Sequence, residues 1–260
     1  MRDVYISLTS IPTRIDILRK CLDSLLKQSY PIKSIILTIP TRTLRSKAKT
    51  VIPDYLYESP YKEKVIIVQP KKDYGPVMKY IGGYNVITKN SLVFVCDDDQ
   101  QYHKNLVKKL VKRHNALPIN EQKETVVTAS GYTILTTHVA WGFGSVLLPY
   151  DTIQLVRQKV VNSSRHVRKC CQLVDDNWVS IILKKYGIRI VNMKIGNEKF
   201  SNGKMLCPED GLALTTNRVK DIIACTYAID HENYYPLVAL VLFILFIIVI
   251  IVNYYWISYM

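Results

Sequence analysis

Three adjacent carboxylates, Asp97-Asp98-Asp99, directly follow the apolar run at 91–96. A continuous apolar run of this length is typical of a strand in the middle of a covered parallel sheet. Adjacent carboxylates repel each other, so a cation or nearby basic groups must offset their charge. Oxygen ligands of this kind favour Mg²⁺ or Mn²⁺ shared with a substrate diphosphate. On an extended chain Asp97 and Asp99 point the same way, which predicts them as metal ligands; the simpler alternative is an acidic turn in which Asp99 caps a helix.

A second acidic pair, Asp175-Asp176, opens a predicted helix at 176–186. Helix capping and the helix dipole account well for one aspartate at a helix start, but less well for two. A carboxylate held at a helix start beside a sugar site can act as a general base. We therefore expect Asp176, or else Asp175, to be a catalytic base.

Polar residues also follow other predicted strands. The stretch from Thr9 to Arg14 follows the first strand, and its hydroxyl and guanidinium groups either hold a nucleotide or simply cap a helix. Lys79 stands just after the Gly75-Pro76 turn and either contacts a phosphate or is a surface lysine. The stretch at 141–145 combines two glycines with two aromatics, which suits a sugar ring or a packed hairpin turn. The sequence has no GxGxxG or Walker A pattern, which argues against a dinucleotide-binding domain and a P-loop NTPase.

The elements expected to position these residues alternate between strand and helix. Apolar β-type runs predict strands at 3–8, 34–39, 64–69, 91–96, 125–130 and 188–193. Amphipathic stretches predict helices at 14–28, 76–88, 106–117, 151–161 and 176–186. This order predicts an α/β fold with a mostly parallel sheet, whose ligands bind beyond the carboxyl ends of the strands.

The C-terminal part of the sequence has a different composition. Residues 236–252 contain no charged residue and no glycine, and seventeen residues are the lower limit for crossing about 30 Å of hydrocarbon. Aromatic residues typical of membrane interfaces flank this run, namely Tyr234, Tyr235, Tyr254, Tyr255 and Trp256. We therefore expect a catalytic domain at 1–233 and a transmembrane tail anchor at 234–260, with a buried core helix as the alternative.

The charge distribution predicts the orientation of this anchor. The net charge is +14, and no Lys or Arg follows the apolar run, whereas Lys204, Arg218 and Lys220 precede it. The positive-inside rule then places the catalytic domain in the cytoplasm. This placement predicts reduced thiols and an unused glycosylation sequon at Asn162. Attraction to anionic lipids accounts for much of the positive charge.

The motifs taken together resemble a known family. IPTR at 11–14, DYGPVMK at 73–79, the three aspartates, WGFGSVLLP at 141–149 and DDNWVS at 175–180 occur in an order similar to that of nucleotide-sugar-dependent glycosyltransferases of the GT-A fold. The resemblance is to the family-two-like group, whose small members are frequent in large DNA viruses. It covers roughly residues 4–230 and implies a GT-A-type Rossmann-like sheet flanked by helices.

This resemblance implies a role for each matching residue. Asp97 and Asp99 would hold Mn²⁺ or Mg²⁺ on the diphosphate of a sugar donor, with Asp97 or Asp98 also near the ribose. The nucleotide would be surrounded by Thr9, Arg14, Asp73 and Lys79, and the sugar or acceptor floor would be formed by Trp141, Gly142, Phe143, Gly144 and Ser145. Asp176, or else Asp175, would deprotonate the hydroxyl of a glycan, lipid or protein acceptor, with inversion. Many relatives have Glu-Asp rather than Asp-Asp at this last position, and many cellular enzymes of this fold carry an N-terminal rather than a C-terminal anchor.

Two other functions fit parts of the sequence. A metal-dependent nuclease or nucleotidyl transferase would explain clustered aspartates and positive charge, with the basic stretch Lys104, Lys108, Lys109, Lys112 and Arg113 along a phosphate backbone. No stacking aromatics are interleaved with this stretch, so a solvated helix face is favoured and no nucleic-acid partner is expected. The third possibility is a catalytically inactive, membrane-bound structural protein that keeps the fold.

Overall fold

The computed structural model describes residues 2–44, 50–134, 137–140, 145–193, 203–205 and 218–232. None of the helices within these ranges is long and apolar enough to cross a membrane. The predicted tail anchor at 234–260 and the predicted sugar floor at 141–144 lie outside the described residues.

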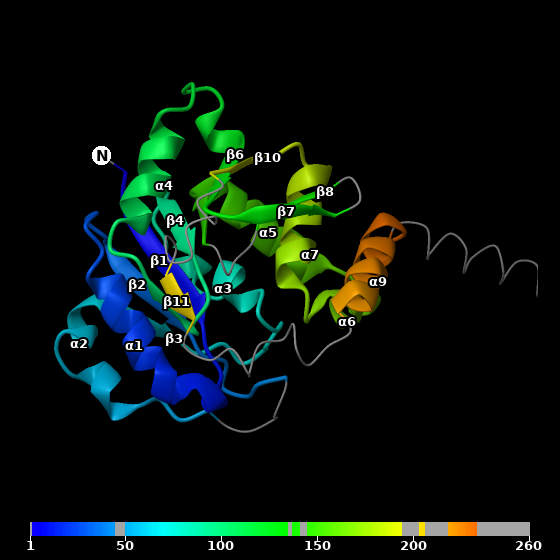
Figure 1. Ribbon diagram of the computed structural model, residues 1–260. Coiled ribbons are helices and arrows are strands. Elements are labelled where there is room, and N and C mark those ends of the chain that lie inside the picture. Colours follow the sequence, from blue (N-terminus) through cyan, green and yellow to red (C-terminus); the bar gives the residue numbers. More distant parts are fainter. Residues whose placement is uncertain are drawn as a thin grey trace, which may run out of the picture.

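A seven-stranded sheet forms the centre of the molecule, in the order β10-β6-β9-β4-β1-β2-β3 (Figure 1). All neighbouring strands pair in parallel except β9, which is antiparallel to both β4 and β6. The strands span Val4–Thr9 (β1), Ser34–Thr38 (β2), Val65–Val68 (β3), Leu92–Val95 (β4), Thr125–Thr128 (β6), Val146–Pro149 (β9) and Arg189–Asn192 (β10). The prediction of a mostly parallel α/β sheet is therefore confirmed.

Helices cover both faces of this sheet because successive strand residues point to opposite faces. In β1, Val4, Ile6 and Leu8 join one apolar core, and Tyr5 joins the other. The first core is covered by α1 (Ile15–Leu26), α2 (Tyr61–Lys64) and α4 (Leu106–Asn115). The second is covered by α3 (Met78–Ile81), α5 (Tyr150–Asn162), α6 (Arg165–Cys171), α7 (Asp175–Lys185) and α9 (Arg218–Asp230).

Most predicted elements are present, but one predicted helix is much shorter than expected. In place of a helix over 76–88, the chain forms α3 and then a 3-10 turn, η3 (Tyr84–Val86). Gly82 and Gly83 separate the two, and a Cβ on Gly82 would lie only 2.3 Å from the Thr38 side chain of β2. The glycines thus let this segment approach the sheet more closely than a regular helix with side chains.

Several elements were not predicted from the sequence. They include β9, the pair β5 (Gln100–Tyr102) and β11 (Gly203–Met205), the hairpin β7 (Gly131–Ile134) and β8 (Thr137–Ala140), and helices α6 and α9. Short 3-10 turns also occur as η1 (Pro12–Arg14), η2 (Asp54–Tyr57) and η4 (Gln122–Glu124). The strands and 3-10 turns among them have only three or four residues and carry too little periodicity to be recognised from sequence, which does not account for the longer helices α6 and α9.

The expectation of reduced thiols is wrong for one pair of cysteines. Cys171 of α6 and Cys225 of α9 form a disulfide, and both side chains are fully buried. Their separation of 54 residues gave no sequence signal for the pairing. The cytoplasmic placement itself stays a prediction.

Replacement of Gly82 by Ala should lower the melting temperature, because the new methyl group overlaps the fully buried Thr38 side chain. Overpacking of this kind costs roughly 1–3 kcal/mol. Combining Gly82→Ala with Thr38→Ala should recover part of the loss, measured as a positive coupling in thermal unfolding. An unchanged melting temperature for Gly82→Ala alone would contradict the close approach of α3 to the sheet.

Candidate active site

The candidate site lies where the order of the sheet reverses. β1 pairs in parallel with β2 on one side and with β4 on the other. In open α/β sheets, ligands bind outside the carboxyl ends of the strands at such a point. The stretch from Thr9 to Arg14 follows β1 and the three aspartates follow β4, so both predicted motifs meet at this edge.

One lysine connects the two acidic clusters. The Nζ atom of Lys79 lies 2.6 Å from Oδ1 of Asp97, 2.7 Å from Oδ2 of Asp175 and 3.4 Å from Oδ1 of Asp176. Its side chain is only 3% exposed. Burial alone would lower the pKa of Lys79, but the three carboxylates outweigh burial and raise this pKa well above its usual value. Lys79 is therefore buried and charged and forms ion pairs with both acidic clusters, and the simpler interpretation as a surface lysine is wrong.

Backbone contacts on both sides hold α3 in this position. The Ser7 hydroxyl of β1 donates a 2.6 Å hydrogen bond to the carbonyl of Lys79. Gly75, in the turn before α3, has a φ of +83° and lies against the backbone carbonyl of Gln172. A Cβ at position 75 would lie only 2.3 Å from this carbonyl oxygen. Gln172 lies just before α7, so this glycine lets the turn before α3 pack close to the chain that leads into Asp175.

Arg14 holds the other two aspartates of the triplet. Its Nη1 atom lies 2.8 Å from Oδ1 of Asp98 and 2.9 Å from Oδ2 of Asp99. The chain bends at 98–99 instead of continuing as a strand, so the expected grouping of Asp97 with Asp99, and Asp98 apart, is not what the ion pairs show. Asp98 and Asp99 share Arg14, while Asp97 turns to Lys79.

The cluster carries more negative than positive charge. Five carboxylates face two cations, which leaves a formal excess of three negative charges within this described group when all five are ionised. Burial and the charges of Asp97 and Asp98 raise the pKa of Asp99 to about 7, although Arg14 opposes this. Burial likewise raises the pKa of Asp98. The cluster as a whole therefore favours an additional cation.

A divalent metal fits the oxygen atoms that remain. Oδ1 of Asp99 is buried and has no hydrogen-bond partner among the described residues, while the Asp97 side chain is 27% exposed. No group of three or more His, Cys, Asp or Glu side chains in the described ranges is arranged to hold a metal ion alone. Two carboxylates are nevertheless a suitable protein share for Mg²⁺ or Mn²⁺, which take most of their other ligands from phosphates and water.

Tyr102 of β5 fixes the backbone of Asp97, a role that the sequence did not indicate. The phenol oxygen accepts a 2.9 Å hydrogen bond from the Asp97 N–H and donates one of 3.0 Å to the Asp97 carbonyl. The Tyr102 side chain is itself buried. The only signal was an aromatic residue soon after the acidic triplet, which had no recognisable meaning before β5 was known.

Two residues predicted near the nucleotide form hydrogen bonds with backbone atoms of the chain. The Thr9 hydroxyl donates to the carbonyl of Thr38 at 2.9 Å. Asp73 accepts hydrogen bonds from the backbone N–H groups of Leu44 and Gly75, at 2.8 and 2.7 Å. These hydrogen bonds all join the two side chains to backbone atoms, and the role of Thr9 and Asp73 at a nucleotide stays a prediction.

The described residues on either side of the segment at 141–144 contact helix α7 or the central sheet. Before it, the Ala140 N–H of β8 donates to the Ser180 hydroxyl of α7 at 3.1 Å. The Tyr132 hydroxyl of the same hairpin donates to Oδ1 of Asn177 at 2.9 Å. After it, the carbonyl of Ser145 accepts from Ala129 just beyond β6. The hairpin therefore packs on the helix that carries Asp175 and Asp176.

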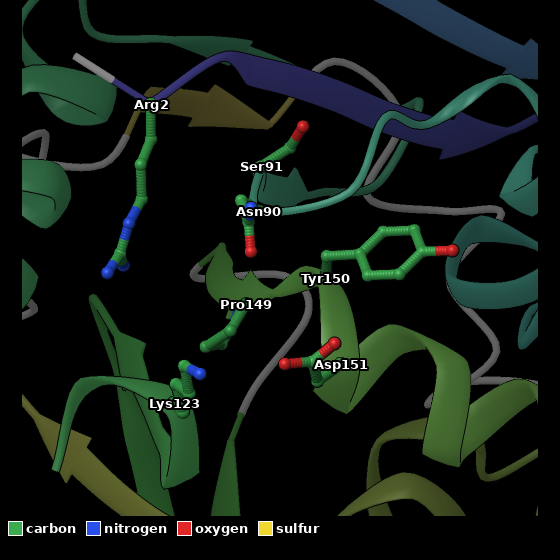
Figure 2. Close-up of a pocket in the computed structure, with 7 residues that line it drawn as sticks. All are labelled: Arg2, Asn90, Ser91, Lys123, Pro149, Tyr150 and Asp151. Atoms are coloured by element: carbon green, nitrogen blue, oxygen red, sulfur yellow. The ribbon is translucent and has the colours of Figure 1, made fainter. Parts of the chain in front are cut away.

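The structure also has a cavity of about 290 Å³ at the opposite edge of the sheet (Figure 2). Its lining includes Arg2 before β1 and Asn90 and Ser91 before β4. The acidic cluster instead follows these strands. This cavity is therefore separate from the candidate site.

No protein-family model and no curated protein matches the sequence of this chain. Among solved structures, the mannosyltransferase PcManGT from Pyrobaculum calidifontis, in complex with GDP-Man and Mn²⁺, has 12% identity and a TM-score of 0.60, over 88% of this chain and 65% of that one. Two further structures are similar. S. aureus TarS has 10% identity and a TM-score of 0.48, over 75% of this chain and 36% of that one. The glycosyltransferase GlyE of Streptococcus pneumoniae TIGR4 has 12% identity and a TM-score of 0.42, over 76% of this chain and 46% of that one. The chain spans less than two thirds of the length of each. Its mixed sheet and flanking helices nevertheless share the fold of the mannosyltransferase.

Proposed function

We propose that this protein transfers a sugar from a nucleoside-diphosphate donor to an acceptor hydroxyl, with Mg²⁺ or Mn²⁺ held by Asp97 and Asp99. The observation that carries the proposal is the meeting of two acidic clusters around Lys79 at the switch point of a glycosyltransferase fold. A nuclease would use similar acids, but the fold and the absence of stacking aromatics in the basic stretch favour sugar transfer.

In this proposal, different side chains serve the diphosphate leaving group and the acceptor. Asp97 and Asp99 would hold the metal on the diphosphate, and Arg14 forms ion pairs with Asp98 and Asp99. When bound, the metal would neutralise the charge that develops on the departing diphosphate. Thr9, Asp73 and the segment at 141–144 belong to the proposal as nucleotide and acceptor contacts.

We assign the base to Asp176 and the anchoring of Lys79 to Asp175. Asp175 lies 2.7 Å from the Lys79 ammonium, whereas Asp176 lies 3.4 Å away. The looser partner gives up its ion pair at lower cost when it accepts a proton from the acceptor. A single displacement with one such base inverts the anomeric centre.

The direct test of the function is release of nucleoside diphosphate from UDP- and GDP-sugars, with and without Mn²⁺. GDP-Man belongs in this set because the neighbour with a TM-score of 0.60 was solved with it. The purified full chain should release nucleoside diphosphate from at least one donor only with Mn²⁺, and ¹H NMR of the product should show inversion. Metal-dependent cleavage of DNA or RNA with no donor turnover would contradict the proposal.

Replacement of Asp99 by Asn should separate stability from activity. Between pH 3.8 and about 7, folded Asp99 binds a proton that the unfolded chain lacks. The free energy of unfolding of wild type therefore falls as the pH rises across this range. Above that pH the variant, in EDTA, should be more stable than wild type by about 1–4 kcal/mol. It should also lose about 100-fold or more in turnover and the rise in melting temperature that Mn²⁺ gives to wild type.

Asp151→Asn is the matched control, since it removes the same charge from an exposed position in the first turn of α5. It should retain both the Mn²⁺-dependent stabilisation and the turnover. If Asp99→Asn also retained both, Asp99 would not be a metal ligand.

Replacement of Asp176 and Asp175 by Asn should give different defects. Asp176→Asn should lower turnover by about 10²–10⁴-fold, because general-base catalysis is lost, and leave the donor Kd unchanged. Asp175→Asn should lower the melting temperature, because the buried Lys79 ammonium loses its 2.7 Å ion pair with Asp175. Collapse of donor affinity in Asp176→Asn, measured by calorimetry, would show that the base assignment is wrong.

A further inference from the structure

Helix α9 is apolar on two opposite faces. Ile222, Cys225 and Ile229 are buried against the rest of the molecule, where α9 packs beside α6 and α7 (Figure 1). On the other side, Val219, Ile223 and Tyr227 are 62%, 57% and 56% exposed. These three residues, here called the α9 stripe, follow each other at intervals of four and therefore form one continuous line along the helix.

The α9 stripe is unusual in this molecule. No other helix in the described part of the chain exposes more than one large apolar side chain. Scattered exposed apolar residues are normal on a protein surface, but a continuous line of them on one helix marks an interaction surface. Tyr227, which stacks on His231 at 4.1 Å, adds an amphipathic ring of the kind found at membrane interfaces.

The position of α9 in the sequence indicates what covers this stripe. Helix α9 ends at Asp230, and the uncharged run at 236–252 begins six residues later. Six residues span at most about 21 Å, so insertion of the predicted span holds the end of α9 within that distance of the bilayer. The helix is 13 residues long, about 20 Å, which is enough to lie along the membrane surface.

We propose that α9 lies on the phospholipid bilayer, with Val219, Ile223 and Tyr227 in its interface and the opposite face of the helix bound to the catalytic domain. This inference rests on the predicted membrane span and not on the proposed sugar transfer. A helix in this orientation holds the candidate site at a fixed height above the membrane, because the Cys171–Cys225 disulfide ties α9 to α6, which packs against α7.

The test is photocrosslinking of the full chain reconstituted in phosphatidylcholine vesicles. A benzophenone amino acid replaces Ile223 or Tyr227, and Ile119, which is 74% exposed after α4, is the matched control position. Mass spectrometry should find lipid adducts at 223 and 227, several-fold above those at 119. Thermal unfolding should show that all three labelled proteins are folded.

Each other outcome overturns the proposal. Adducts between two copies would show that the α9 stripe is a dimer contact. Adducts confined to the same chain would show that another segment of the protein covers it. Equal lipid labelling at 119 and 223, or none at either, would show that α9 does not lie on the bilayer.

Discussion

A single buried ammonium group holds the candidate site together. Lys79 contacts Asp97 from the loop after β4 and the acidic pair at the start of α7, which are far apart in the sequence. Removal of the Lys79 ammonium would leave three carboxylates in a buried place without their shared cation, which is costly for a folded protein. The geometry of both acidic clusters is therefore coupled through Lys79, and the glycines around α3 are the means by which the chain brings this lysine to the sheet.

Two cations do not neutralise five carboxylates, and the pKa of Asp99 is raised first by its burial and then by the charges of Asp97 and Asp98. A fold under selection for stability alone would replace one of these acids with an amide. A catalytic site for a metal-bound diphosphate, by contrast, uses the residual negative charge to attract the metal. The cost in stability and the proposed function have the same origin.

Periodicity and apolar runs were enough to predict the α/β class, most of the sheet and the edge at which the site lies. They also placed Arg14 and the three aspartates at one edge of the sheet, because carboxyl ends of parallel strands meet there, whereas their role in a site stays a prediction. They did not predict which carboxylate pairs with which cation, since a bend at 98–99 reverses the expected alternation. β9 was missed because four apolar residues carry no period, and the Cys171–Cys225 pair because spacing alone does not identify disulfide partners.

The central claim is that Asp97 and Asp99 bind a divalent cation together with a nucleoside diphosphate. Crystals of the full chain grown with Mn²⁺ and GDP or UDP test it through the anomalous signal of manganese. The account predicts one strong peak in contact with carboxylate oxygens of Asp97 and Asp99 and with the diphosphate. Bound nucleotide with no manganese at these two residues, or manganese bound elsewhere, would contradict it.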